Sequence, residues 1–173
     1  LYIEYHDKEW GKPVYDDETL FEFLLLESFQ AGLSWITILK KRENFRAAFD
    51  NFDYKKIANY NQNKFDELIV NSGIIRNKLK VKSATTNAQL FMEIQQEFGS
   101  FSKFIWSYVD GKPIINKFTK REDVPATTDL SDKISKDLKK RGFKFVGSTI
   151  IYAFMQATGM VNDHTTNCFK YPN

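Results

Sequence analysis

Apolar residues recur along most of this chain three or four positions apart, and few stretches alternate between apolar and polar residues. This period indicates helices nearly throughout, so the predicted fold class is all-α. The first helix can be capped by Asp16 or Asp17, and segment 114–128, which contains Pro125, is expected to be an extended loop. Helices are expected at 16–29, 34–49, 54–59, 62–71, 76–98, 101–108, 129–140 and 148–158.

One acidic residue interrupts the most apolar part of the first helix. Glu27 lies four positions after Phe23 and seven after Leu20, so it shares their inward face and is expected to be buried. Burial without a partner raises a carboxyl pKa by as much as ~3 to 5 units. With Trp35 after a short turn, Glu27 predicts a pocket for a flat ligand that carries positive charge or hydrogen-bond donors. The alternative is a structural acid that is paired with an arginine or capped by backbone amides.

Length and composition restrict the number of domains, the class of partner and the cellular setting. The 173 residues form one domain, 1–173, with a sizeable core, and the net charge of +3 permits a polyanionic partner. A single cysteine, Cys168, excludes an intramolecular disulfide and favours a reducing, cytoplasmic setting. The least charged stretch, 147–161, is too short to span a membrane and is expected to be a core helix. Because the chain begins at Leu1 without an initiator methionine, a segment upstream is expected to be missing.

Both histidines and the only cysteine lie near the two ends of the chain. If their segment is helical, His164 and Cys168 share one face, and with His6 they offer nitrogen and sulfur ligands that suit a tetrahedral metal such as zinc. Such a metal would join the chain ends, so its role would be structural. The alternatives are a histidine that bonds carbonyls at a helix end and a small buried cysteine.

A basic segment with two glycines predicts a helix-hairpin-helix. One helix is expected to end at Gly142, a hairpin to pass through Gly147, and an apolar helix to follow. Glycines let backbone amides approach a phosphate, and the basic flanks, including Lys144, add attraction without reading base sequence. The alternative is an ordinary helix connection with a glycine cap. A second glycine turn, 72–76, is followed by lysines at 78, 80 and 82 and could grip the same backbone.

Aromatic residues surround His6. Aromatic side chains make up 16% of the chain, so most must belong to the core, and Tyr2 and Trp10 are expected to be packing residues. Tyr5 differs because a phenol beside a buried acid can orient that acid or bond the same ligand.

Several ordered strings resemble the DNA-3-methyladenine glycosylase I family of the helix-hairpin-helix superfamily, and the resemblance covers essentially the whole chain. The strings are Tyr5-His6-Asp7, Glu9-Trp10-Gly11, Leu26-Glu27, Gln30-Ala31-Gly32-Leu33-Ser34-Trp35-Ile36-Thr37, Leu39 to Asn44, Gly73-Ile74-Ile75-Arg76, Leu138 to Gly147 and Asn162-Asp163-His164. The resemblance implies two helical lobes around a base-binding cleft. It also implies hydrolysis of the N-glycosidic bond of 3-methyladenine in alkylated double-stranded DNA, which leaves an abasic site and releases free 3-methyladenine.

The resemblance also assigns roles to residues. An enzyme that acts on a base must take it out of the stack, and methylation has already made this base cationic and a good leaving group, so selective capture can carry much of the catalysis. Glu27 would be the catalytic residue that recognises the base, with Tyr5 assisting and Trp35 stacking. Leu33 would fill the gap in the duplex. Asp163 remains an alternative for activating water or stabilising the sugar cation.

The resemblance further implies one structural zinc per chain, held by His6, His164 and Cys168. The fourth ligand, a cysteine upstream of Leu1, is not in this sequence, and neither is an upstream tryptophan of the base pocket. A monomer without membrane association is expected. Two other readings stay open: a catalytically idle helix-hairpin-helix DNA-binding module, and a zinc-held helical scaffold with no nucleic-acid role.

Overall fold

The computed structural model describes residues 1–172 and is mostly helical. The expected helices are present to within a few residues, but a first helix, α1, and a pair of very short strands were not expected. The elements in chain order are α1 (Tyr2–Lys8), α2 (Asp17–Gln30), α3 (Trp35–Ala48), η1 (Asp50–Phe52), α4 (Tyr54–Ile57), α5 (Gln62–Ile69), α6 (Lys78–Phe98), α7 (Phe101–Trp106), η2 (Ser107–Val109), β1 (Ile114–Ile115), η3 (Arg121–Asp123), α8 (Asp129–Lys140), α9 (Ser148–Ala157) and β2 (Val161–Asn162).

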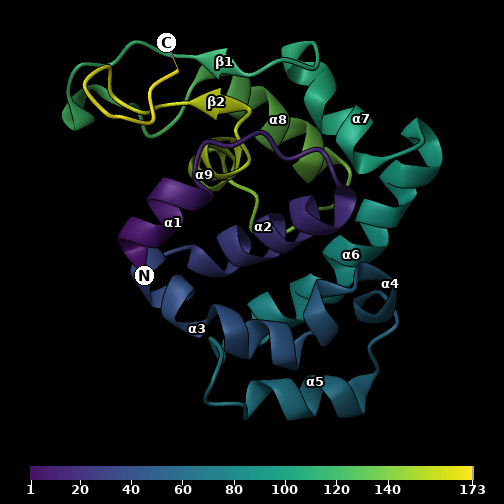
Figure 1. The fold of residues 1–173 in the computed structure, drawn as a ribbon. Helices are drawn as coiled ribbons and strands as arrows, with labels where there is room; N and C mark the ends of the chain where they lie inside the picture. Colours follow the sequence, from purple (N-terminus) through teal and green to yellow (C-terminus); the bar gives the residue numbers. More distant parts are fainter. Residues whose placement is uncertain (173) are drawn as a thin grey trace.

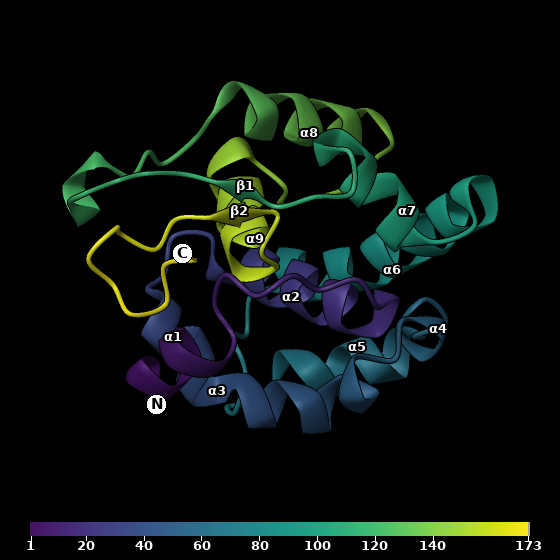
Figure 2. The ribbon, with the colours of Figure 1, turned by 45° about the horizontal axis from the view of Figure 1, so that its top comes forward.

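Helix α2 runs through the middle of the molecule. It contacts α3, α6, α7 and α9, and nine of its fourteen residues are buried. In Figure 1 and Figure 2, α3 and α5 lie on one side of α2, whereas α8, α9 and the strands lie on the other. Two groups of helices therefore share α2 as a common wall, as the expected two-lobed arrangement requires.

Two aspartate side chains fix the start of α2, and a glycine turn follows its end. Asp16 is the cap, because its Oδ2 accepts a hydrogen bond from the amide of Thr19 at 2.8 Å. Asp17, the first helical residue, instead accepts from the amides of Phe101 and Ser102, at 2.9 and 2.8 Å, and so ties α2 to the start of α7. After α2, Gly32 has a φ of +79°, a backbone conformation that glycine adopts without strain.

The segment expected to be an extended loop is organised at both ends. Ile114 pairs with Val161 and Ile115 with Asn162 in a two-stranded parallel sheet, which corrects the purely helical prediction. Beyond β1, residues 116–128, here called the strap, run beside residues 163–172, here called the C-terminal segment (Figure 2). The amide of Thr166 donates to the carbonyl of Phe118 at 2.9 Å, so the two segments stay connected.

The chain after α1 crosses the end of α9 at very close range. A Cβ atom built on Gly159 would lie 2.4 Å from the carbonyl carbon of Lys12 and 2.5 Å from the nitrogen of Pro13, and the φ of Gly159 is +72°. The amide of Val14 donates to the carbonyl of Thr158 at 2.9 Å. This crossing places α1 beside α9. Within residues 1–172, no helix combines the length and apolarity needed to cross a membrane.

Candidate functional site

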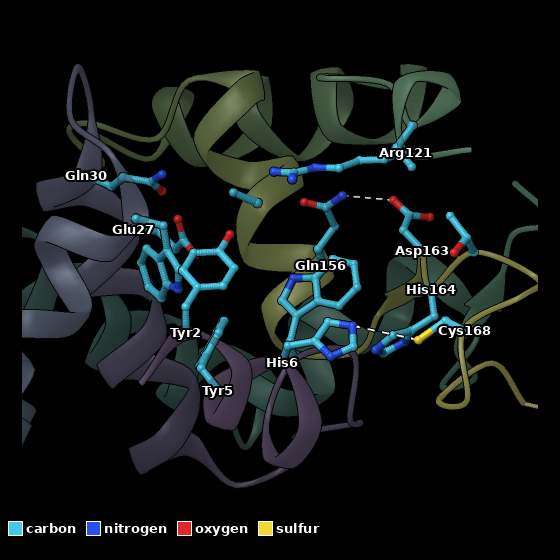
Figure 3. Close-up of a pocket in the computed structure, with 15 residues that line it drawn as sticks. Tyr2, Tyr5, His6, Glu27, Gln30, Arg121, Gln156, Asp163, His164 and Cys168 are labelled. Atoms are coloured by element: carbon cyan, nitrogen blue, oxygen red, sulfur yellow. Dashed lines mark hydrogen bonds between the residues drawn. The ribbon is translucent and has the colours of Figure 1, made fainter. Parts of the chain in front are cut away.

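A cavity of about 490 Å³ opens between α1, α2, α9, the strap and the C-terminal segment. This volume lies in the range of small-molecule sites, about 300 to 1,000 Å³. Figure 3 shows Glu27, Tyr2 and Gln30 toward one end and His164 and Cys168 toward the other. The lining residues are Tyr2, Tyr5, His6, Trp10, Glu27, Gln30, Trp35, Arg121, Val124, Ala153, Gln156, Asp163, His164, Thr165 and Cys168.

Glu27 is buried, as the helical spacing predicted. Its exposed fraction is 2%, and Oε2 has no hydrogen-bond partner among residues 1–172. Desolvation raises the pKa of this carboxyl well above its ordinary value. The arginine alternative is not supported, because the buried Arg42 donates instead to Glu22 at 2.7 Å and to Glu9 at 2.8 Å. The cavity therefore contains a buried carboxyl group that forms no ion pair with any described residue.

Two aromatic residues lie beside this acid. The rings of Tyr5 and Trp35 are tilted by 50°, with centroids 5.5 Å apart. Burial, and then the charge of Glu27, raise the pKa of Tyr5, so its phenol stays protonated and can donate. The Nε1 of Trp35 is also buried without a partner in the described chain. An acceptor on Glu27 and a donor on Trp35 are thus both available to a ligand, and buried polar atoms are otherwise nearly always satisfied.

The structure changes the expected roles of the other aromatic residues. Tyr2 was expected to be a packing residue, but it is 47% exposed and lines the cavity next to Glu27. Trp10 also lines the cavity while packing edge-on against His164, with centroids 4.7 Å apart. Residues 2–8 were not predicted to form a helix, so Tyr2 was not expected to lie on the cavity side.

Several residues that line the cavity were not predicted from the sequence. Gln30 lies one helical turn after Glu27 on α2, a spacing that could have identified it. Gln156 on α9 and Arg121 on the strap come from segments whose position depends on tertiary contacts, and no local signal marks them.

Asp163 is buried in the same cavity wall and is fully bonded. Its oxygens accept from Asn116 Nδ2 at 2.7 Å, from Gln156 Nε2 at 2.9 Å and from the hydroxyl of Tyr152. These bonds join the strap, α9 and the C-terminal segment. These contacts indicate that Asp163 anchors the strap and the C-terminal segment to α9.

His6, His164 and Cys168 lie together at the other end of the cavity. Their ligand atoms all lie within 4.8 Å of one another, and Cys168 Sγ is 3.8 Å from His6 Nε2. The predicted proximity is confirmed, although residues 164–168 are not helical and form an irregular segment with a turn.

The donors in this cluster fit a metal ion. Burial, followed by the neighbouring His6, lowers the pKa of His164 to about 4, so its ring is neutral near pH 7. Its Nδ1 contacts Asn162 Oδ1 at 2.9 Å, while its Nε2 is buried without a partner among the described residues. Two imidazole nitrogens and one sulfur are a donor set that zinc favours.

The hairpin between α8 and α9 is present, with part of its polar backbone already bonded. The amide of Gly142 donates to Lys139 at 2.9 Å and that of Lys144 donates to Asn87 Oδ1 at 2.9 Å, so neither is free for a phosphate, contrary to expectation. Gly147 caps α9, and a Cβ there would meet nothing within 4 Å. Gly147, with the exposed side chain of Lys144, is the part of the hairpin open to a partner.

The turn from α2 to α3 carries Leu33, which is 40% exposed. Lys80 of α6 holds this turn, because its Nζ donates to the carbonyls of Phe29 at 2.9 Å and Ala31 at 2.6 Å. Lys80 is 6% exposed, so the expectation that it could grip a partner's backbone is wrong. It instead supplies the positive charge that the C-terminus of α2 lacks in its own last turn.

Comparisons with known proteins agree over the whole chain. The family model of the methyladenine glycosylases matches residues 1–171. The chain is 49% identical to DNA-3-methyladenine glycosylase 1 of Escherichia coli strain K12, with coverage of 99% of this chain and 92% of that protein. It is 50% identical to DNA-3-methyladenine glycosylase of Haemophilus influenzae, with coverage of 97% and 91%.

Comparison with solved structures also finds 3-methyladenine DNA glycosylases. A crystal structure of 3-methyladenine DNA glycosylase I superposes with a TM-score of 0.96 at 51% identity, covering 99% of this chain and 94% of that one. A structure from a study of 3-methyladenine recognition by the Staphylococcus aureus enzyme also gives 0.96, at 41% identity, with coverage of 99% and 92%.

Proposed function

The chain belongs to the methyladenine glycosylase family, and on this premise we propose a role for each part of its cavity. The protein is a DNA repair glycosylase that excises 3-methyladenine. The C1′–N9 bond breaks with its electron pair passing to the cationic base, which leaves neutral. Water then adds to C1′ with loss of a proton, and an abasic site remains.

The unpartnered carboxylate of Glu27 carries this proposal. A base inside the duplex cannot reach a cavity, so the damaged nucleotide must be flipped out. An adenine methylated at N3 is cationic in the nucleotide. It supplies the positively charged partner that Glu27 Oε2 does not have within the described chain. Trp35 and Tyr5 enclose the ring, and Tyr5 offers a hydroxyl to the same ligand. An unmodified adenine is neutral and leaves the buried carboxylate uncompensated, which gives selectivity.

The residues that we propose to bind DNA are those that are accessible at the surface near the cavity and the hairpin. Leu33 is an apolar side chain at the tip of a turn beside the cavity, where it can fill the space that a flipped base leaves in double-stranded DNA. We assign the α8–α9 hairpin as a helix-hairpin-helix, with Gly147 and Lys144 binding phosphate. Gly142, which was expected to bind phosphate, is instead a turn residue, because its φ is +103° and its amide is bonded.

Zinc is proposed for the cluster of His6, His164 and Cys168. When bound, it would join α1 to the C-terminal segment as a structural cross-link. Metal analysis of the purified protein by mass spectrometry is expected to show one zinc per chain, and a chelator is expected to lower the thermal midpoint. Cys168→Ser should show reduced zinc content. An unchanged midpoint after complete zinc removal contradicts the structural role.

Chromatography of bases released from methylated duplex DNA tests the function. We expect release of 3-methyladenine and no release of unmodified adenine, because only the methylated base is a cation that complements the carboxylate of Glu27. If the protein binds abasic DNA but releases no base, it is instead an idle DNA-binding module. If it neither binds DNA nor releases a base, the scaffold interpretation holds.

A further inference from the structure

Arg121 is a charged residue of the cavity wall that no step above uses. It begins η3 in the strap, and Figure 3 shows its side chain reaching across the cavity above Tyr2 and Gln156. Its guanidinium makes no hydrogen bond or ion pair with any residue from 1 to 172. Arg42 and Arg141, by contrast, each pair with a glutamate at 2.8 Å. Arg121 therefore has its full donor capacity available.

The position of Arg121 is fixed by more than its own segment. The strap starts at a backbone bond from the amide of Asn116 to the carbonyl of Asn162, 3.1 Å long. The Asn116 side chain is bonded to the buried Asp163, as described above. Val124, three residues after Arg121, lines the same cavity. Arg121 is thus placed on a segment anchored at the cavity, so the fold sets the position of its backbone at the cavity wall.

The charges in the cavity differ in sign, which restricts what Arg121 can bind. A cationic base gains from Glu27 but is repelled by a guanidinium, so Arg121 does not suit the base itself. A flipped nucleotide also brings the phosphates on either side of its sugar to the cavity mouth. Planar guanidinium groups bind phosphate with paired hydrogen bonds, whereas a lysine acts as a point charge.

We propose that Arg121 binds a DNA phosphate that flanks the flipped nucleotide and so holds the sugar over the cavity. This proposal rests on the proposed function and adds a contact on the strap, separate from the hairpin between α8 and α9. Arg121 and Glu27 then bind two parts of one nucleotide with opposite charges. A free base satisfies only Glu27, so the arrangement favours the nucleotide in DNA over the released product.

Arg121→Met tests the proposal, with Lys120→Met as the matched control. Both changes remove one positive charge from neighbouring exposed positions, but Lys120 is not in the cavity lining. For Arg121→Met we expect affinity for duplex DNA containing an abasic-site analogue to fall about 10-fold or more. The slope of log affinity against log salt should decrease in magnitude by about 0.9, because one phosphate contact is lost. Lys120→Met should change affinity much less, and Arg121→Lys should restore part of it.

Binding of free 3-methyladenine gives the second readout. Arg121→Met should bind the free base about as tightly as the wild type, since the free base is neutral and carries no phosphate. The proposal is overturned if the salt slope of Arg121→Met equals that of the wild type, or if free-base binding weakens. Both results differ from failure of the proposed function, in which the wild-type protein itself releases no 3-methyladenine.

Discussion

Replacing Glu27 with glutamine keeps the size and shape of the side chain and removes its ability to become negatively charged opposite a cationic base. The carboxyl group is buried and unpartnered at Oε2 in the free protein, so the substitution breaks no ion pair in the described structure. It leaves an amide that can still accept a hydrogen bond. The change therefore separates the contribution of charge from those of packing and shape.

The magnitude follows from the environment of the acid. Two unit charges about 4 Å apart attract by about 4 kcal/mol at an effective dielectric constant of about 20. A hydrogen bond to a charged group contributes about 1.5 to 3 kcal/mol, against about 0.5 to 1.5 for a neutral one. A loss of about 2 to 4 kcal/mol is therefore expected, which corresponds to about 30- to 1,000-fold in rate.

The assay is single-turnover release of 3-methyladenine from methylated duplex DNA, measured by chromatography. Glu18→Gln is the matched control, because Glu18 is exposed on the same helix and should leave release unchanged. Circular dichroism should confirm that both variants are folded. If Glu27→Gln releases the base at the wild-type rate, charge recognition by Glu27 is refuted.

Stability should change in the opposite direction from activity. Burial raises the pKa of Glu27 well above 4.5, so at pH values between 4.5 and this raised pKa the folded protein holds a proton that the unfolded chain has lost. The contribution of this group to stability is complete below the unfolded pKa and is lost as pH rises through the folded pKa. Glutamine does not titrate. Thermal midpoints of Glu27→Gln should therefore exceed those of the wild type at pH 8 and converge with them toward pH 4.

Three further substitutions test other parts of the molecule. Leu33→Ala should lower excision from duplex DNA about 10-fold or more, because the gap in the duplex is not filled, while calorimetric binding of free 3-methyladenine stays unchanged; weakened free-base binding would instead place Leu33 in the base pocket. Lys80→Met should lower the free energy of unfolding in urea by about 1 to 3 kcal/mol, because two carbonyls at the end of α2 lose a charged donor; a loss no larger than that of the exposed Lys82→Met would show that these bonds contribute little. Gly159→Ala should cost more than about 2 kcal/mol in the same measurement, since its Cβ would overlap the backbone of Lys12; wild-type stability would show that this crossing yields easily.

Much of the helical framework was predictable because its signals are local. Asp16 caps α2 in the structure, Gly32 follows its end, and the helical period placed Glu27 on the buried face. The proximity of His6 and His164 was also predicted, although by resemblance and by position near the chain ends rather than by geometry.

The missing parts depend on contacts between distant segments. Strands β1 and β2 have two residues each, too few for a recognisable pattern, and they form only because each supplies the other's partner. Lys80 stands among basic residues that look solvent-exposed, yet the carbonyls that bind it belong to a different helix. Arg121 carries no local mark of its place in the cavity, since that place is set by the anchoring of the strap.

The connection between the strap and the C-terminal segment makes them one cooperative unit of local unfolding. The amides of Ile114 and Asn116 bond to the segment that leads to His164, and the amide of Thr166 bonds back to the strap. Fraying of the tail would therefore spread into the wall that carries Arg121. Amide protons of the two segments should exchange with solvent in concert, so damage at the carboxyl end of the chain would disturb the cavity without touching Glu27.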